Sequence, residues 1–139
     1  MTEHLNTALI QKLYDAFGKG DMNTILGTLA DDADWIMEGP TIIPYSGKRK
    51  GIAQIVEFFQ ALATTQTGQK LTVETIVAQG DVVATFGRYS ATVTATGKKF
   101  DSHVAHFFTI RNGKIAKFVD VVDTASMADA YRGAAAAGR

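Results

Sequence analysis

The sequence feature that most constrains the fold is a hairpin signal at Asn112-Gly113, in the last third of the chain. Apolar and polar residues alternate on both sides of this dipeptide, as they do in half-buried strands. Asn and Gly both tolerate the positive φ angles of a type I′ turn, so the sequence predicts a tight antiparallel hairpin here. The register of this hairpin matters, because residues that pair across two strands share one face of the sheet.

Helical patterns occupy the first half of the chain. Apolar residues recur every three or four positions over 5–17 and again over 52–62, which predicts a first and a third helix. Between them, Asp21 is a favourable N-cap for a short second helix, and the apolar run Trp35–Met37 predicts a short strand. Residues 38–51 contain both prolines and three glycines, so we expect a loop there.

After Gly68 the apolar pattern changes to a period of two. It predicts strands near 71–79, 82–95, 98–111 and 114–123, with turns at Gln79–Asp81, Thr96-Gly97 and Asn112-Gly113. A closing helix is expected over 125–132. Helices followed by a meandering antiparallel sheet predict an α+β fold, with the helices packed on one face of the sheet. We expect one domain over 1–132 and a flexible, low-complexity tail over 133–139.

Composition excludes several classes of site and partner. The 139 residues include 14 basic and 14 acidic side chains, so we expect neither a nucleic acid nor a membrane surface as partner. The absence of cysteine excludes disulfides, thiol nucleophiles and Cys-based zinc sites. No apolar run approaches the roughly 20 residues of a membrane helix. The first ten residues lack the pattern of a signal peptide, so a cytoplasmic protein is expected.

Two-residue loops at the last two turns would fix the register of three strands. Ala105 would then pair with Asp120 on one side and with Arg88 on the other, which brings all three into one row. His103 would lie diagonal to Asp120, within reach of its side chain. A loop of another length would shift the register, and an odd shift would exchange the two faces of a strand.

This register makes Asp120, His103 and Arg88 the candidate catalytic residues, because charged groups on an otherwise apolar face usually mark function. The alternatives are a solvated face, or an ion pair that only fixes the fold. His106 falls on the opposite face, and Asp123 is expected to cap the end of the strand or the next helix. No metal site is expected, because two histidines on opposite faces are poorly placed to share an ion.

Three segments carry a resemblance to a known family: residues 13–40 (LYDAFGKGDMNTILGTLADDADWIMEGP), 44–59 (PYSGKRKGIAQIVEFF) and 103–125 (HVAHFFTIRNGKIAKFVDVVDTA). In this order they resemble the SnoaL-like branch of the nuclear transport factor 2-like superfamily. That superfamily includes polyketide cyclases, ketosteroid isomerases and limonene epoxide hydrolases. The resemblance covers nearly the whole chain. It implies a curved sheet wrapped around a long helix, a cone with a deep apolar pocket, and a homodimer.

The isomerase pattern transfers only in part. The aspartate base of those enzymes has its nearest counterpart in Glu38, about one position away. Their two oxyanion donors, a tyrosine and a protonated aspartate, are replaced by Leu13 and Ala105. Tyr14 is adjacent to Leu13 but would point elsewhere on a helix. The resemblance therefore does not imply the full ketosteroid isomerase mechanism.

The other two branches leave Asp120 as the best-matched residue. Arg88 and Asp120 resemble the arginine and one aspartate of the epoxide hydrolases, but Ser90 replaces the second aspartate. Asp120 also resembles the acid–base aspartate of the polyketide cyclases, and His103 is the closest histidine in the expected register.

The resemblance implies a pocket for a small hydrophobic molecule that carries an oxygen function. We expect acid–base chemistry of the isomerase, cyclase or hydrolase type, with no cofactor; no dinucleotide-binding glycine motif is present. The alternative is a non-catalytic module that only binds such a molecule. The expected ligand contacts, any of which could instead be plain core residues, are Trp35, Met37, Tyr14, Phe59, Phe86, Ser90, Phe107, Phe118 and Tyr45. Of these, Tyr45 would cover the mouth of the pocket.

Overall fold

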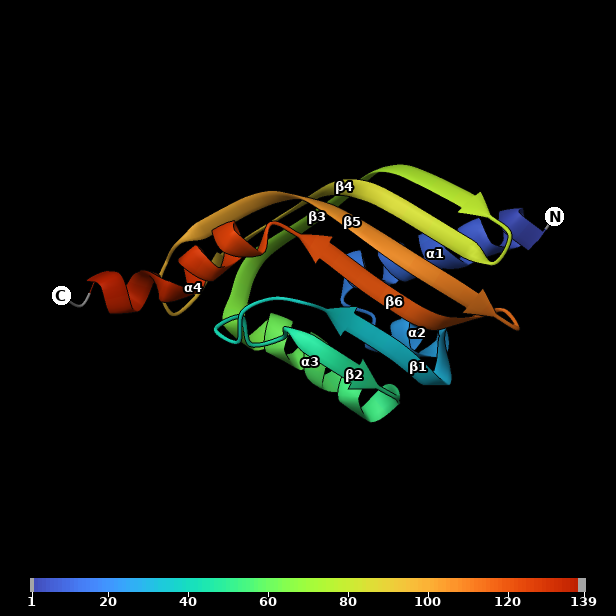
Figure 1. Ribbon diagram of the computed structural model, residues 1–139, viewed down its shortest axis with the longest axis horizontal. Coiled ribbons are helices and arrows are strands. Elements are labelled where there is room, and N and C mark those ends of the chain that lie inside the picture. The colour runs from blue at the N-terminus through green and yellow to red at the C-terminus, as the bar shows by residue number, and fades with distance from the viewer. Residues whose placement is uncertain (1, 138–139) are drawn as a thin grey trace.

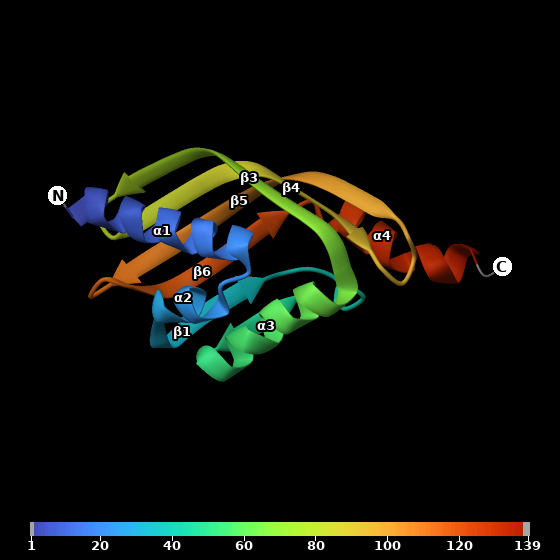
Figure 2. The ribbon, with the colours of Figure 1, turned by 180° about the vertical axis from the view of Figure 1, so that it is seen from behind.

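Three N-terminal helices lie on the concave side of a curved six-stranded sheet, and a fourth helix lies at one end of the sheet (Figures 1 and 2). The computed structural model describes residues 2–137. The helices are α1 (Thr2–Lys19), α2 (Met22–Gly27), α3 (Ile52–Thr65) and α4 (Thr124–Ala137). The strands are β1 (Leu29–Met37), β2 (Gly47–Lys50), β3 (Gln66–Gln79), β4 (Val82–Val93), β5 (Lys99–Arg111) and β6 (Lys114–Val122). The predicted α+β fold, with helices on one sheet face, is confirmed.

The helices form where the apolar spacing predicts them. Ile10 and Leu13 of α1 are buried against the sheet, three residues apart on one helical face. Gly20, with φ 68°, ends this helix, and Asp21 caps the next one by accepting a hydrogen bond from the Thr24 backbone N–H at 3.1 Å. In α3 the buried positions are Ile55, Phe58 and Leu62.

The sheet is mixed, in the order β2-β1-β6-β5-β4-β3. All neighbouring strands are antiparallel except β1 and β6, which run parallel. The expectation of a purely antiparallel sheet is wrong for this pair, because β1 joins the sheet beside a strand far away in sequence. The expected loop over 38–51 contains β2, a short edge strand that pairs with β1. No apolar alternation marks it, because three of its four residues are Lys or Arg.

The hairpin at Asn112-Gly113 is confirmed. Its two turn residues have φ angles of 53° and 72°, and Arg111 pairs with Lys114. The loop between β4 and β5 is longer than two residues, which moves that register by two positions. Arg88 therefore pairs with His103 and not with Ala105. An even shift leaves the faces of the two strands unchanged.

A bulge in β6 exchanges the faces of its second half. The expected pairing holds up to Ile115, where Ala116 is inserted as an extra residue. Beyond the bulge Asp120 pairs with His106, whereas an unbroken register would pair it with Ala105. The predicted row through Ala105 and Asp120 is therefore wrong, and this one-residue shift determines the composition of the site.

The C-terminal helix extends further than predicted. The backbone of α4 is helical to Ala137, within the segment 133–139 that was expected to be a flexible tail. Residues 138–139 of that segment lie outside the described residues. Within residues 2–137, no helix is both long enough and apolar enough to cross a membrane.

Candidate active site

A row of side chains crosses the concave face of the sheet. The register places Thr85 of β4 beside His106 of β5, and His106 beside Asp120 of β6. Next to it, two residues along each strand, runs an apolar row made of Val83, Phe108, Phe118 and Trp35. Each polar side chain of the first row therefore has an apolar neighbour on its own strand.

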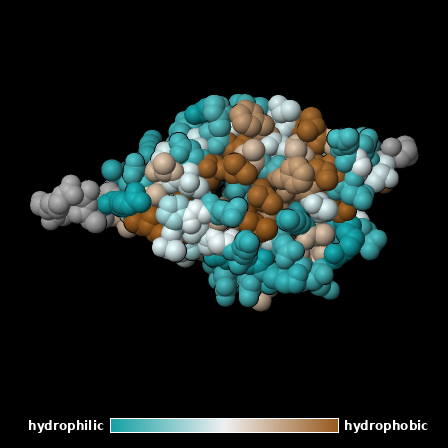
Figure 3. Space-filling model, in the orientation of Figure 1, coloured by the Kyte–Doolittle hydropathy of each residue, from teal (hydrophilic) through white to brown (hydrophobic). Residues whose placement is uncertain are grey.

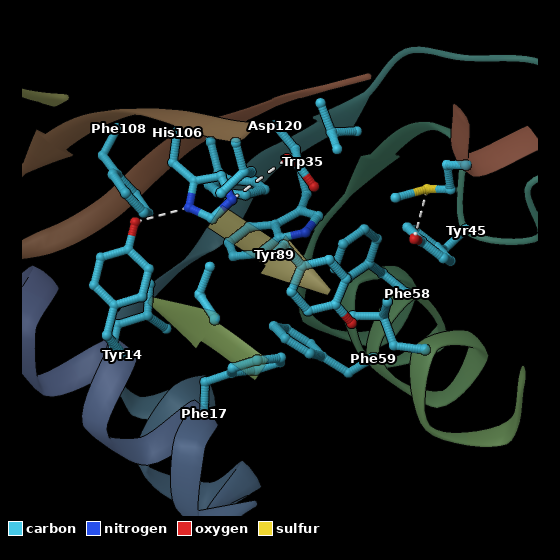
Figure 4. Close-up of a pocket in the computed structure, with 17 residues that line it drawn as sticks. Tyr14, Phe17, Trp35, Tyr45, Phe58, Phe59, Tyr89, His106, Phe108 and Asp120 are labelled. Carbon is cyan, nitrogen blue, oxygen red and sulfur yellow. Dashed lines mark hydrogen bonds and ion pairs between the residues drawn. The ribbon is translucent and has the colours of Figure 1, made fainter. Parts of the chain in front are cut away.

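Tyr14 of α1 connects to this row from the helical layer. Its Oη lies 2.7 Å from Nδ1 of His106 and 2.6 Å from Oγ1 of Thr85. The other ring nitrogen of His106, Nε2, lies 3.3 Å from Oδ1 of Asp120 (Figure 4). Thr85, Tyr14, His106 and Asp120 are termed the inner polar row below. In it, one imidazole joins a carboxylate to a phenol.

Asp120 has an incompletely paired carboxylate. Its side chain is only 13% exposed, and that of His106 is 10% exposed. The two form an ion pair when the imidazole is protonated, but the contact is not aligned as a hydrogen bond. Within residues 2–132, Oδ1 of Asp120 is buried without a hydrogen-bond donor. Its lone pairs therefore have no aligned donor, although Nε2 of His106 lies 3.3 Å away.

Tyr14 remains a hydroxyl donor over the working pH range. Burial raises its pKa well above the ordinary value of 10.0; the Thr85 hydrogen bond opposes this shift in part, and the charge of Asp120 adds to it. When His106 is neutral at Nδ1, Tyr14 donates to it and accepts from Thr85. When Nδ1 carries a proton, it donates to Tyr14, which donates to Thr85. The hydrogen bonds of Tyr14 are therefore satisfied in both protonation states of His106.

An apolar cavity of about 70 Å³ lies between this face of the sheet, α1 and α3. Tyr14, His106 and Asp120 contribute its ionisable groups near α1. Aromatic rings form much of the remaining wall: Phe17, Trp35, Phe58, Phe59, Phe108 and Phe118. A polar group of a ligand therefore has few possible partners in the wall, and three of them, Tyr14, His106 and Asp120, belong to the inner polar row.

The cavity continues into a wider groove of about 590 Å³ between α1 and α3. The two hollows share part of their walls: Tyr14, Phe17, Phe59, Leu62 and Leu71. Phe17 of α1 and Phe59 of α3 lie where they meet, with ring centroids 6.3 Å apart (Figure 4). These two rings therefore border the route from the groove to Asp120.

The expected ligand contacts divide between the two faces of the sheet. Those that line the cavity are Trp35, Tyr14, Phe59, Phe118 and Tyr45. Tyr45 does not cover the mouth, because it is fully buried and its Oη donates to Sδ of Met127 at 2.8 Å. Met37 is buried beside Asp120 but does not form part of the wall.

Phe86, Ser90 and Phe107 lie on the convex face, so their expected place in the pocket is wrong. They were grouped with Asp120 through an unbroken register, and the bulge at Ala116 separates them from it. Phe86 and Phe107 are instead exposed to solvent.

The candidate catalytic residues divide in the same way. Asp120 lies in the cavity, but Arg88 and His103 contact each other on the convex face, with Nη1 of Arg88 3.0 Å from Nε2 of His103. Arg88 also forms an exposed ion pair with Asp101. The prediction that Arg88 and His103 lie beside Asp120 is therefore wrong. The expected cap is confirmed, since Asp123 accepts a hydrogen bond from the Ser126 backbone N–H at 3.1 Å.

His106 is the site residue that the expected register placed on the wrong face. The spacing of the apolar residues Ile115 and Phe118, three positions apart, is a sequence signal for the bulge that lies between them. Both are buried, yet an odd spacing puts two residues of a regular strand on opposite faces. Of the isomerase counterparts, Ala105 lies on the convex side and Glu38 is exposed after β1, whereas Tyr14 points into the cavity.

The comparisons with known proteins agree with this fold. The SnoaL-like domain family matches residues 10–118. Among solved structures, an NTF2-like protein of Burkholderia thailandensis is 28% identical (TM-score 0.83), with 90% of this chain and 95% of that chain covered. TerC, co-crystallised with polyporic acid, is 26% identical (TM-score 0.83), with coverages of 92% and 98%.

A Rhodopseudomonas palustris protein provisionally named an isomerase is also 26% identical (TM-score 0.77), and the match covers 100% of both chains. No curated protein matches the chain. The family match spans most of the sequence, including all of β5 with His106 and the first part of β6. The chain therefore belongs to the SnoaL-like family of the nuclear transport factor 2-like superfamily.

Proposed function

We propose that this protein transfers a proton to or from carbon in a small apolar substrate that carries a carbonyl group, with Asp120 as the base. The observation that carries the proposal is the buried Oδ1 of Asp120, which lines an apolar cavity without a hydrogen-bond donor. A base must be able to approach the proton that it removes, and the Asp120 side chain lines the cavity, while Nε2 of His106, 3.3 Å from Oδ1, forms no aligned hydrogen bond with it. No cofactor is needed for such a step.

His106 supports this role because it lies close enough to Asp120 to stabilise its negative charge. Its Nε2 lies 3.3 Å from the carboxylate, so a protonated imidazole stabilises the ionised form. Its Nδ1 is held by Tyr14, which fixes the orientation of the ring. The pair can therefore keep a proton within the cavity and return it to another atom of the substrate, as an isomerase or a cyclase requires.

The relatives support the class of function and not a particular substrate. One carries an isomerase name, and another was crystallised with polyporic acid. Both descriptions fit an aromatic-lined cavity that accepts an oxygenated molecule. An oxygenated ligand held near the Asp120 carboxylate is suited to proton transfer on a carbonyl compound.

The second candidate function is binding without turnover. The apolar lining favours it, because walls of aromatic and aliphatic side chains can hold an apolar molecule without reacting with it. Trp35 and Phe118 also stack with ring centroids 4.0 Å apart, which is the packing of a stable core. In this case a ligand would be held and released unchanged.

Hydrogen–deuterium exchange of ketones separates the two functions. We expect the protein to accelerate exchange of the α-hydrogens of cyclohexanone or 2-tetralone in D₂O, followed by NMR. Asp120→Asn should slow this exchange by about 10²- to 10⁴-fold, because it removes the base. Asp101→Asn is the matched control, since Asp101 is exposed on the convex face.

Retained exchange in Asp120→Asn would show that Asp120 is not the base. Binding of both ketones without any exchange by the unmodified protein would favour the binding module instead.

A further inference from the structure

Trp35 contains the second unpaired polar atom of the cavity. Within residues 2–132, only two buried side-chain nitrogen or oxygen atoms lack a hydrogen-bond partner: Nε1 of Trp35 and Oδ1 of Asp120. Both residues line the same cavity. Buried polar groups in native proteins are nearly always paired, so two unpaired atoms in one hollow indicate that a ligand supplies the missing partners.

The two atoms lie on adjacent strands with a fixed relation. Trp35 of β1 pairs with Phe118 of β6, and Asp120 lies two residues further along β6 on the same face. With strands about 4.8 Å apart and a rise of about 3.3 Å per residue, their backbones are roughly 8 Å apart. Stacking on Phe118 holds the indole in place, and both Trp35 and Asp120 line the cavity drawn in Figure 4. A small molecule can touch both residues at once.

The chemistry of the two atoms is complementary. An indole N–H only donates, so its partner must be an acceptor such as a carbonyl oxygen. An ionised carboxylate only accepts, so its partner must be a proton or a donor. A ketone with hydrogen on the adjacent carbon offers both at neighbouring atoms.

We propose that Trp35 Nε1–H binds the carbonyl oxygen of the substrate and stabilises the enolate that forms when Asp120 removes the α-proton. The C–H bond breaks, and its electrons form the C=C bond of the enolate. The carbonyl π electrons move to oxygen, and the proton forms an O–H bond with Asp120. The negative charge thus moves from the carboxylate to the oxygen that faces the indole. This inference rests on the proposed function and names its substrate class.

The indole N–H can be observed directly, because Trp35 is the only tryptophan in the chain. A ¹H–¹⁵N spectrum of the uniformly labelled protein therefore contains one indole signal. We expect 2-tetralone to move its proton resonance downfield, as a new hydrogen bond does. Tetralin, the same bicycle without the carbonyl, should not. Absence of a downfield shift with cyclohexanone and 2-tetralone, or an equal shift with tetralin, would overturn the inference.

Trp35→Phe removes the donor and retains an aromatic ring against Phe118. We expect it to weaken 2-tetralone binding about three- to tenfold, as for one neutral hydrogen bond, and to leave tetralin binding unchanged. The exchange rate should fall by about 10²-fold, because the charged enolate depends on the donor more than the ketone does. A variant that still prefers 2-tetralone to tetralin as strongly as the unmodified protein would contradict the proposal.

The two proposals can fail separately. An indole shift with 2-tetralone but no exchange would support Trp35 as the acceptor-binding group and refute proton abstraction. Exchange without an indole shift would support proton abstraction and refute Trp35 as the acceptor-binding group. In Asp120→Asn, the shift should persist while exchange is lost. If Trp35→Phe does not fold, the ligand series on the unmodified protein still decides the question.

Discussion

His106 has a partner at each ring nitrogen, and this determines what the site can do. Tyr14 lies at Nδ1 and Asp120 at Nε2, so the imidazole cannot turn away from the carboxylate without losing a hydrogen bond. His103, three residues earlier, lies on the convex face, where its Nε2 is 3.0 Å from Nη1 of Arg88 and its ring stacks on Phe86. The two histidines therefore differ in surroundings and not in residue type. Only His106 is placed to influence chemistry in the cavity.

Three buried tyrosines predict sensitivity to alkaline pH. Burial raises the pKa of Tyr14, Tyr45 and Tyr89 above the ordinary value of 10.0. Above about pH 10 the unfolded chain releases these protons while the folded protein keeps them. Stability is therefore complete below this pH and falls as the pH rises toward the raised values. Urea unfolding at several pH values should show a loss of up to about 1.4 kcal/mol per pH unit for each tyrosine.

Tyr45→Phe serves as the control for this prediction. It removes one of the three phenols, so the slope above about pH 10 should become shallower by up to about 1.4 kcal/mol per pH unit. An unchanged slope, or native tyrosines that ionise near pH 10 by ultraviolet absorbance, would contradict the expectation.

At the scale of elements, local signals predict what local interactions form. The α1 and α3 helices follow from apolar spacing, and the last hairpin follows from the conformations open to Asn112-Gly113. The bulge at Ala116 and the edge strand β2 could not be predicted in this way, because each depends on a partner strand. The sequence therefore identified Asp120 as a site residue but not its partner His106, because their pairing depends on the bulge.

Gly87 provides a test of strand packing. An added Cβ at this position would collide with the backbone carbonyl of Thr72, on the neighbouring strand β3. Because backbone cannot move aside as a flexible side chain does, Gly87→Ala should destabilise the protein by about 2–3 kcal/mol. Gly18→Ala, near the end of α1, is the control: its Cβ meets nothing within 4 Å, so stability should rise by up to about 1 kcal/mol. Urea unfolding measures both, and equal effects would contradict this reading of β3 and β4.

At the scale of the whole molecule, the sheet separates a candidate reaction site from an apolar outer surface. Figure 3 shows hydrophobic residues gathered over the convex side, where the exposed apolar residues include Phe86, Phe107 and Val121. Exposed apolar patches commonly mark protein contacts. The expected homodimer stays a prediction, which light scattering of the protein in solution would test.

We place the site on the concave face, around Asp120 and His106. Ketone exchange by His106→Gln and His103→Gln tests this placement most directly, because the two histidines lie on the same strand and opposite faces. His106→Gln should slow exchange at least about tenfold, since it removes the ionisable partner of Asp120. His103→Gln should leave the rate within about twofold, as expected for an exposed residue away from the chemistry. Loss of exchange in His103→Gln with full exchange in His106→Gln would contradict the account.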